Sequence, residues 1–355
     1  MYKLPEKIIN FTPYEPLVGE YKIRLDVNES FIEIDEKIVT EAVKKVKLNR
    51  YPDPYATAAV KAFAGLFGID SRLAVAGNGS DELIGVIASA FLQKGDKLLC
   101  FKPDFPMYGF YSRLYELDVV EMQKNEDFNI DIDEIINFIN EKSIMCVIFS
   151  NPCNPTSLGI NKAAVKRLAE SVSALVILDE AYMDFWDENE SLLSEVQKYD
   201  NLIVLRTCSK SVALAGIRLG FAVSNLTITS ALKAAKSPFN VNALSQAIGE
   251  AVLSDAENYR NSIAMIKEST ARLYKALTEL AMFEKIYETR TNFVFIKTEK
   301  AGEIYKYLLG KSIAVRCFGN YLRICAGTDE ENEELIKALK EFQKRREKHE
   351  QNSGN

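Results

Sequence analysis

The fold is decided by one stretch of the chain, Asn201-Leu-Ile-Val-Leu-Arg-Thr-Cys-Ser-Lys-Ser-Val-Ala-Leu-Ala-Gly-Ile-Arg-Leu-Gly-Phe-Ala-Val-Ser224. The apolar run Leu202–Leu205 is short and rich in branched side chains, which predicts a buried strand. A second apolar run, Leu219–Val223, predicts another strand, and a loop of polar and small residues connects the two. Lys210 is therefore expected at the mouth of a buried strand.

The residues of this loop suggest a cofactor. An amine at a strand mouth loses hydration, which favours the neutral form of Lys210, and a neutral lysine amine is a nucleophile towards aldehydes. Thr207, Ser209 and Arg218 supply the hydroxyl donors and the guanidinium that a phosphate dianion needs. A lysine beside a phosphate site suggests pyridoxal phosphate. The alternative is an exposed loop lysine beside a structural arginine.

The composition sets the class of protein. With 355 residues the chain is expected to form two domains, and 47% hydrophobic and 26% charged residues are ordinary for a soluble globular protein. The net charge of -6 and the pI near 5.3 argue against a nucleic-acid partner. No apolar run approaches the roughly 20 residues of a membrane span, and the start has no signal-peptide pattern. The six scattered cysteines are expected to be reduced thiols of a cytoplasmic protein.

The histidine count narrows the chemistry. The sequence has a single histidine, His349, in a charged C-terminal stretch. Unless that stretch folds back into the core, a Ser-His-Asp triad, a Cys-His pair and a histidine-based zinc site are all excluded, and we expect no metal site. The chemistry is expected to use lysine, carboxylates, tyrosine, arginine or a cofactor.

The order of elements predicts two domains. Strands and helices alternate from about residue 57 to 224, which indicates an α/β domain with a largely parallel sheet. After Pro238 a long helix is predicted over Ala243–Lys275, followed by mixed strands and helices. We expect an N-terminal arm and lead-in helix at 1–45, a large cofactor-binding α/β domain at 46–248, a smaller α+β domain at 249–346 and a disordered tail at 347–355.

Candidate side chains follow one predicted strand after another. Gly77-Asn-Gly-Ser-Asp-Glu82 turns into a helix whose free amides can bind an anion, although Ser80 and Asp81 can also be plain helix caps. Four further residues come just after strands, with core packing, chain reversal or capping as alternative roles: Phe105, Asn154, Asp179 and Tyr182. Because strand ends converge on one crevice in a doubly wound sheet, we expect all of them to lie close to Lys210.

The chain resembles the class I and II pyridoxal phosphate-dependent aminotransferases of fold type I, and within them the branch that acts on histidinol phosphate. The motifs that carry the resemblance occur in the family's order from residue 28 to residue 323. They are Asn49-Arg-Tyr-Pro-Asp-Pro54, Gly77-Asn-Gly-Ser-Asp-Glu82, Pro103-Asp-Phe-Pro-Met-Tyr108, Asn151-Pro-Cys-Asn-Pro-Thr156, Asp179-Glu-Ala-Tyr182, Thr207-Cys-Ser-Lys-x5-Gly-x-Arg218 and Leu322-Arg323. The resemblance implies the pyridoxal phosphate-dependent transferase fold: an α/β fold with a mostly parallel central sheet in a large domain and a smaller α+β domain.

The resemblance also implies the roles of the cofactor site. Lys210 is similar to the lysine that forms the Schiff base and moves the proton, Asp179 to the partner of the pyridinium nitrogen, and Tyr182 and Asn154 to the ligands of the phenolate oxygen. Phe105 stands at the ring-stacking position, which usually holds tyrosine, so it can stack but cannot donate a hydrogen bond. The resemblance also implies a phosphate site, formed by Ser80, Asp81, Thr207, Ser209 and Arg218 and completed by Tyr51 from a second subunit.

For the substrate the resemblance implies Tyr14, Asn28, Asn154 and Arg323, with Arg323 on the substrate's carboxylate or the equivalent polar end. For Arg24 and Arg316 two interpretations stay open, the same cleft or a solvated surface, and for each taken singly we expect the surface. A homodimer with shared sites is implied, acting on an amino donor and a 2-oxo acid, with histidinol phosphate and 2-oxoglutarate as the pair. Alternatives on this fold are a phosphothreonine decarboxylase, an aromatic amino-acid aminotransferase and a non-catalytic cofactor-binding regulator.

One departure from the family motif concerns the turn after Asn154. The usual Asn-Pro-Thr-Gly reads Asn154-Pro-Thr-Ser-Leu-Gly159 here. Ser157 and Leu158 therefore stand as an insertion ahead of Gly159, and we expect the turn beside Asn154 to be reshaped.

Overall fold

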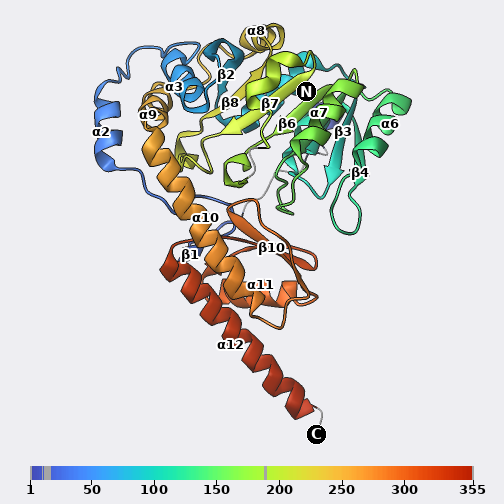
Figure 1. Ribbon diagram of the computed structural model, residues 1–355, viewed down its shortest axis with the longest axis vertical. Coiled ribbons are helices and arrows are strands. Elements are labelled where there is room, and N and C mark those ends of the chain that lie inside the picture. Colours follow the sequence, from blue (N-terminus) through green and yellow to red (C-terminus); the bar gives the residue numbers. More distant parts are fainter. Residues whose placement is uncertain (1, 10, 12–16, 188–189, 354–355) are drawn as a thin grey trace.

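The computed structural model describes residues 2–9, 11, 17–187 and 190–353. Tyr14, a predicted substrate-binding residue, lies outside the described residues. Figure 1 shows a larger sheet with its helices in the upper part of the molecule and a smaller sheet below it, with helix α10 (Ala256–Thr278) running from one to the other. The boundaries of the two predicted domains stay a prediction.

The larger sheet has seven strands in the order β2-β8-β7-β6-β5-β3-β4. The strands from β7 to β4 in this order are parallel to one another, while β8 is antiparallel to both β2 and β7. The predicted α/β class with a mostly parallel sheet is therefore confirmed. The strand bounds are Ala74–Gly77 (β2), Lys97–Lys102 (β3), Asp118–Gln123 (β4), Cys146–Ser150 (β5), Leu175–Asp179 (β6), Leu202–Thr207 (β7) and Gly220–Ser224 (β8).

Helices cover both faces of this sheet. Their bounds are Glu36–Lys44 (α2), Thr57–Phe67 (α3), Gly79–Phe91 (α4), Met107–Leu114 (α5), Ile132–Lys142 (α6), Lys162–Ser171 (α7), Leu226–Ala235 (α8) and Ala243–Leu253 (α9). Several begin at a residue whose side chain accepts a hydrogen bond from an amide of the first turn, which fixes where the helix starts. These caps are Asp35, Asp131, Asn161, Asn225 and Asn242.

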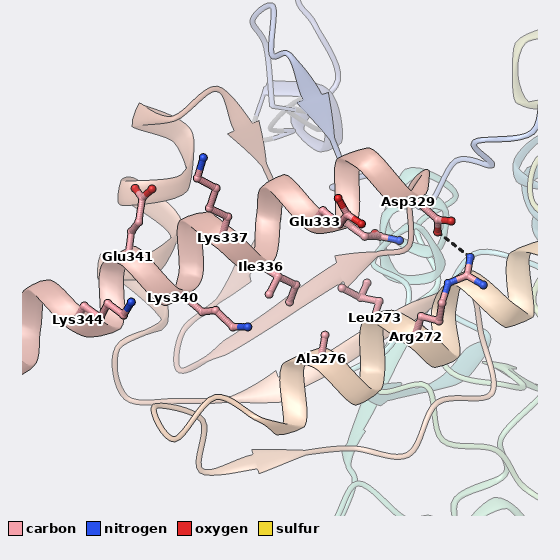
Figure 2. Close-up of a pocket in the computed structure, with 11 residues that line it drawn as sticks. Arg272, Leu273, Ala276, Asp329, Glu333, Ile336, Lys337, Lys340, Glu341 and Lys344 are labelled. Carbon is pink, nitrogen blue, oxygen red and sulfur yellow. Dashed lines mark hydrogen bonds and ion pairs between the residues drawn. The ribbon is translucent and has the colours of Figure 1, made fainter.

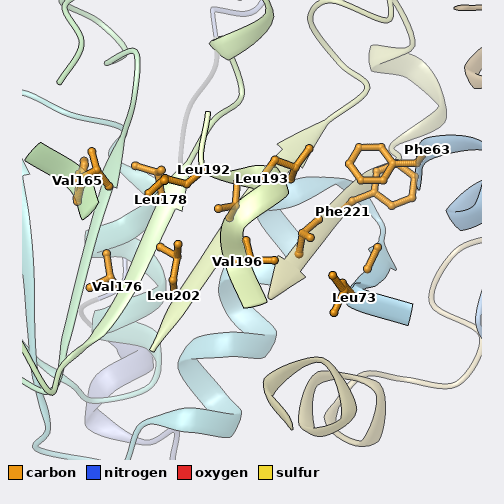
Figure 3. Packing of buried hydrophobic residues seen from close by; sticks show 14 of the residues in the cluster. Phe63, Leu73, Val165, Val176, Leu178, Leu192, Leu193, Val196, Leu202 and Phe221 are labelled. Carbon is orange, nitrogen blue, oxygen red and sulfur yellow. The ribbon is translucent and has the colours of Figure 1, made fainter. Parts of the chain in front are cut away.

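The strands of the larger sheet are apolar on both faces because helices pack on each. Leu178 and Phe221 face one layer of helices, where the ring of Phe221 stacks on Phe63 of α3 with centroids 4.1 Å apart (Figure 3). Ile177 and Ile203 face the opposite layer. A period of two residues thus places alternate side chains in two separate cores, as expected for a doubly covered parallel sheet.

The smaller sheet has four antiparallel strands in the order β12-β13-β10-β9. Its elements are β9 (Lys285–Ile286), β10 (Phe293–Lys297), β12 (Arg316–Phe318), β13 (Tyr321–Cys325), α11 (Ala301–Gly310) and α12 (Asp329–Ser353). Together with α10 these elements enclose their own apolar cluster, which includes Ile266, Val294 and Leu335. The small sheet therefore has a core distinct from that of the large sheet.

The chain departs from the predicted pattern at two places. The prediction of one long helix over Ala243–Lys275 is wrong, because this stretch forms two helices, α9 and α10. The second helix begins where the side chain of Asp255 accepts a hydrogen bond from the amide of Asn258 at 2.9 Å. At the C-terminus, α12 continues to Ser353, within the stretch 347–355 that the sequence predicts to be disordered. Residues 354–355 lie outside the described residues.

The N-terminal arm docks on the small sheet of its own chain. A short helix, α1 (Glu6–Ile9), precedes β1 (Ile23–Arg24), which pairs in parallel with β11 (Ile313–Ala314). The amide of Cys325 donates to the carbonyl of Leu25 at 3.0 Å. This docking brings the residues that follow Leu25 to the space between the two sheets. Among the described helices, none combines the length and the apolar character needed to cross a membrane.

We predict that Phe221→Ala lowers the free energy of unfolding by about 3–5 kcal/mol, because the ring is fully buried and its removal leaves a cavity beside Phe63. Denaturant unfolding followed by circular dichroism measures the change. Leu226→Ala at the start of α8 is the control: that side chain is 46% exposed and should change the free energy by about 0.5 kcal/mol at most. Equal effects of the two substitutions would contradict the assignment of Phe221 to the core.

Candidate active site

A cavity of about 520 Å³ lies between the carboxyl ends of the parallel strands, the small sheet and the docked arm. It is lined by the predicted site residues Asn28, Ser80, Asp81, Phe105, Asn154, Asp179, Tyr182, Thr207, Ser209, Lys210, Arg218 and Arg323. Tyr51 does not line it: its side chain is 82% exposed and its ring stacks on Phe239 at 4.6 Å. The strand ends therefore converge as the topology requires, and Tyr51 faces away from its own chain's cavity.

Lys210 stands half-buried at the wall of this cavity, in the loop after β7. Its Nζ donates a hydrogen bond to the carbonyl of Val27 in the arm at 2.9 Å. Desolvation by the surrounding protein lowers the pKa of Lys210 to about 8, and the positive charge of Arg323 acts in the same direction. A larger share of this amine is therefore neutral near neutral pH than in an exposed lysine, as a nucleophile requires.

Asp179 ends β6 and is buried at the floor of the cavity. Its Oδ2 accepts a hydrogen bond from the hydroxyl of Tyr108 at 2.9 Å, and its Oδ1 accepts one from the amide of Ala181 at 3.1 Å. Burial outweighs these two bonds and raises the pKa of Asp179 to about 7. A cationic partner in the cavity would restore the ionised form, so Asp179 is suited to hold a protonated ring nitrogen.

Sequence reasoning gave Tyr108 no role, although it lies in the quoted motif Pro103–Tyr108. The residue is fully buried on α5 and orients the carboxylate of Asp179. Its ring also meets that of Phe105 edge-on, with centroids 5.6 Å apart. The sequence does indicate its contact with Phe105, because residues three positions apart lie on the same side of a helical turn.

The N-terminus of α4 opens into the cavity through Ser80 and Asp81. Two glycines allow the backbone at the start of α4 to lie close to β8 and to Arg218. A Cβ on Gly220 of β8 would lie 2.4 Å from the amide nitrogen of Ser80, and one on Gly79, where φ is +81°, would lie 2.7 Å from Nη2 of Arg218. Unpaired amides and the helix dipole at such an N-terminus favour an anion.

Hydroxyl and guanidinium groups complete this anion site. The hydroxyl of Thr207 donates to Oγ of Ser209 at 3.0 Å, and Nη1 of Arg218 donates to the same oxygen at 3.4 Å. Nη2 of Arg218 lies 3.9 Å from Oδ2 of Asp81. Donors from two loops and a helix end thus surround one corner of the cavity, which is the arrangement that a phosphate group needs.

Tyr182 and Asn28 contact each other in the lining of the cavity. Nδ2 of Asn28 donates to the hydroxyl oxygen of Tyr182 at 2.9 Å, and burial raises the pKa of Tyr182 to about 12. Asn28 is itself buried with a positive φ of 56°, and its Oδ1 has no hydrogen-bond partner among the described residues. A buried acceptor without a donor points to a ligand that supplies one.

Arg323 on β13 links the small sheet to the strand ends. Its Nη1 donates to Oδ1 of Asn154, and its Nη2 donates to the carbonyl of Asp26 at 2.5 Å. The guanidinium also lies over the ring of Phe293, 5.4 Å from its centroid. Arg323 is buried, so its charge faces the cavity with little screening by water.

Arg316 also reaches the cavity, so the expectation that it lies at a solvated surface is wrong. Arg316 is the cross-strand partner of Arg323 in the β12–β13 ladder. Directly paired residues of an antiparallel ladder project to the same face, so both guanidinium groups belong to one wall. Arg24 is exposed and pairs with the buried carboxylate of Asp26 at 3.1 Å.

A buried ion-pair network connects the loops that carry these groups. Arg206 of β7 donates from Nη1 to Glu180 at 3.1 Å and from Nη2 to Asp184. The hydroxyl of Ser211 donates to the other oxygen of Asp184 at 2.5 Å. Burial alone would lower the pKa of Arg206, but the two carboxylates more than offset this and raise it. The loop after Asp179 is thereby tied to the loop that contains Lys210.

The inserted Ser157 has a structural role. Its φ is 65°, in the left-handed region, and its side chain is fully buried. Its hydroxyl accepts a hydrogen bond from the amide of Arg290 at 2.9 Å and contacts Oγ1 of Thr289 and of Thr291, at 3.2 and 2.8 Å. The turn beside Asn154 is thus tied to the residues that precede β10, in the small sheet.

A second cavity, of about 690 Å³, lies between α10 and α12 (Figure 2). Its rim carries Lys337, Lys340 and Lys344 of α12, and an ion pair of 2.7 Å between Arg272 and Asp329 closes one end. The lining comes from the outer surfaces of two helices and contains no strand end and none of the predicted site residues. The chemistry therefore belongs to the cavity at the strand ends.

The groups around that cavity fit the predicted cofactor, pyridoxal phosphate. The corner at the N-terminus of α4 suits the phosphate, Asp179 suits a pyridinium nitrogen, and Lys210 suits an aldehyde. The hydroxyl of Tyr182 and the amide of Asn154 can meet an oxygen substituent of the ring. The donor set and the two glycines at the anion site support this fit independently of one another.

Comparisons with known proteins agree with this geometry. The family model described as aminotransferase class I and II matches residues 6–339. A histidinol-phosphate aminotransferase of Clostridium novyi is 41% identical over 94% of this chain and 95% of its own. The histidinol-phosphate aminotransferase structure from Clostridium acetobutylicum has a TM-score of 0.83 at 26% identity, covering 91% of this chain and 99% of its own.

A third relative shows the same fold. The Sinorhizobium meliloti histidinol-phosphate aminotransferase, solved in complex with pyridoxal-5'-phosphate, has a TM-score of 0.88 at 21% identity, with 97% of this chain and 98% of that chain covered.

We predict that cofactor-free Asp179→Asn protein is more stable than cofactor-free wild type at about pH 8. Because the folded-state pKa of Asp179 is raised to about 7 from its ordinary value of 3.8, the folded state binds more protons than the unfolded state between these values. Wild-type stability should therefore fall relative to the variant as pH rises through this window. Melting temperatures at about pH 5 and pH 8 measure the difference. If the melting temperatures of the variant and the wild type differed by the same amount at both pH values, the carboxylate would not be desolvated.

Proposed function

The chain belongs to the aminotransferases of class I and II, and we propose that it transfers the amino group of histidinol phosphate to 2-oxoglutarate with pyridoxal phosphate as cofactor. This places it in histidine biosynthesis. The observation that carries the substrate assignment is the pair Arg316 and Arg323 on one wall of the cavity, together with relatives that bear this activity in their names.

The cofactor would be held by residues at the N-terminus of α4 and in the loops that follow the strands of the larger sheet. The N-terminus of α4, with Ser80 and Asp81, and the side chains of Thr207, Ser209 and Arg218 would hold its phosphate. Asp179 would pair with the ring nitrogen, Phe105 would lie against the ring, and Tyr182 and Asn154 would contact the ring oxygen. When bound, pyridoxal phosphate supplies an aldehyde that condenses with amines and a ring that accepts the electron pair left at Cα.

Lys210 would both attach the cofactor and move a proton. Its neutral Nζ is the nucleophile towards the aldehyde, and once displaced by the amino donor the same Nζ can take the proton from the donor's Cα. A pKa of about 8 suits a group that must accept and release a proton near neutral pH. Asp179 would keep the ring nitrogen protonated during this transfer.

The anionic end of the substrate would lie against Arg316 and Arg323. Guanidinium groups pair bidentately with phosphate, and two of them on a common wall suit a dianion better than a single carboxylate. Phenylalanine and tyrosine lack such a group at the end remote from the amine, so this wall favours a phosphorylated donor. Phosphothreonine carries the same group, and only the products of the reaction separate a transaminase from a decarboxylase.

The test compares histidinol phosphate with histidinol, which lacks the phosphate. Arg316→Gln should lower kcat/KM for histidinol phosphate by about 10- to 100-fold, because a hydrogen bond to a charged group contributes about 1.5–3 kcal/mol. The value for histidinol should stay within about twofold of wild type, which makes it the internal control. Two results would refute the substrate assignment. One is faster turnover of phenylalanine or tyrosine than of histidinol phosphate, and the other is release of carbon dioxide from phosphothreonine.

We also propose a cytoplasmic homodimer with shared sites. Tyr51, Tyr55 and Phe239 are exposed apolar side chains at one region of the chain, and exposed apolar patches mark interaction surfaces. Tyr51 would reach the phosphate site of the partner. The six cysteines are all free thiols, which suits a reducing compartment.

Mixed dimers test the sharing of sites. A dimer of one Tyr51→Phe chain and one Lys210→Ala chain should contain one intact site and one site with both lesions. It should therefore show about half of wild-type activity, more than either variant homodimer. Activity below that of the Tyr51→Phe homodimer would mean that each site is built from a single chain.

A further inference from the structure

Cys153 and Lys124 form a buried contact on the far side of the turn that carries Asn154. Nζ of Lys124 donates to Sγ of Cys153 at 2.9 Å and lies 3.4 Å from Oδ2 of Asp104. The side chains of Lys124 and Asp104 are only 2% and 1% exposed, and Cys153 is 3% exposed. An amine, a thiol and a carboxylate are therefore held together where solvent is nearly excluded.

The proposed function gives this cluster no task. Lys124 follows the edge strand β4, and Cys153 lies between Asn151 and Asn154 in the turn after β5. Asp104 precedes Phe105 and also accepts a hydrogen bond from Ser150. Burying a lysine is costly unless it is paired, so the carboxylate and the thiol offset the desolvation cost of Lys124.

A small oxidant can reach the cluster. Lys124, Cys153 and Ser150 line a cavity of about 530 Å³ that also includes Phe128 and Leu158. Ser150 lines the active-site cavity as well, so the two spaces share a wall. Burial raises the pKa of the other five thiols, to about 12 for Cys100 and Cys325, which makes them poor nucleophiles.

We propose that Cys153 and Lys124 are the site of a reversible oxidative cross-link, a sulfenamide formed under hydrogen peroxide. In the first step Sγ of Cys153 attacks one oxygen of the peroxide; the O–O bond breaks, water is released, and the thiol becomes a sulfenic acid. The sulfur loses two electrons and the peroxide gains them.

In the second step the ammonium of Lys124 first gives one proton to the carboxylate of Asp104. Its Nζ then attacks Sγ, the N–S bond forms and the S–O bond breaks. The departing hydroxide takes a second proton from the nitrogen and leaves as water. The linked protein is therefore two hydrogens lighter than the reduced one, and a thiol reductant reverses the link by exchange.

The link would act on the active site through the turn. An N–S bond is shorter than the present contact of 2.9 Å between Nζ and Sγ, so the link draws Lys124 and the turn that carries Cys153 towards each other. Its neighbour Asn154 accepts a hydrogen bond from Arg323 and would be displaced with it. We expect oxidised protein to lose activity and to regain it on reduction.

The test treats wild-type holoenzyme with hydrogen peroxide and analyses non-reduced peptides by mass spectrometry. The expected product is a peptide pair joining Cys153 and Lys124, lighter by about 2 Da and released by dithiothreitol. This readout does not depend on the substrate, so a failure of the proposed function leaves it intact. Peroxide-treated wild type in which Cys153 carries only sulfinic acid or a disulfide would overturn the proposal.

Two matched variants separate the link from simple thiol oxidation. Lys124→Arg keeps the positive charge beside Asp104 but offers no nucleophilic amine, so Cys153 should advance to sulfinic acid and the loss of activity should be irreversible. Cys153→Ser removes the sulfur, so peroxide should leave its activity and its Lys124 peptide unchanged. Equal reversibility in wild type and Lys124→Arg would also overturn the proposal.

Discussion

The buried guanidinium of Arg206 between Glu180 and Asp184 is the interaction on which the site depends. Its two carboxylate partners lie in the loop after β6, and Ser211, next to Lys210, bonds to one of them. Breaking such a buried network leaves an unpaired charge and typically costs about 3–5 kcal/mol. The network therefore fixes the separation between the loops that present the carboxylate of β6 and the amine after β7.

The same burial gives the site its reactivity. Desolvation raises the pKa of Asp179 and lowers the pKa of Lys210, so it shifts both groups towards their neutral forms. The charged form of each group is less stable in the cavity than in water, and both groups gain a partner when a phosphorylated aldehyde with a ring nitrogen binds. The cavity therefore destabilises the charged forms of two groups that the bound cofactor would pair with, and active sites commonly trade stability for function in this way.

Sequence reasoning reached the features that follow from topology. Parallel strands bring their carboxyl ends to one edge, so the order of the strands alone is enough to place Asp179 close to Lys210. Features that depend on side-chain contacts across the fold were missed. Tyr108 acts through Asp179, a carboxylate far away in sequence, and Arg316 lines the cavity because it pairs with Arg323 across the β12–β13 ladder. The sequence shows Ser157 as an insertion, but its bonds to the small sheet cannot be predicted from the motif.

The central claim is that Lys210 is the amine that attaches the cofactor. Purified protein loaded with pyridoxal phosphate can be reduced with borohydride, digested and mapped by mass spectrometry, which locates the modified lysine directly. We expect the cofactor mass on Lys210, with none attached to Lys210→Ala protein that still binds the cofactor non-covalently. Attachment to another lysine, or equal labelling of the variant, would contradict the claim.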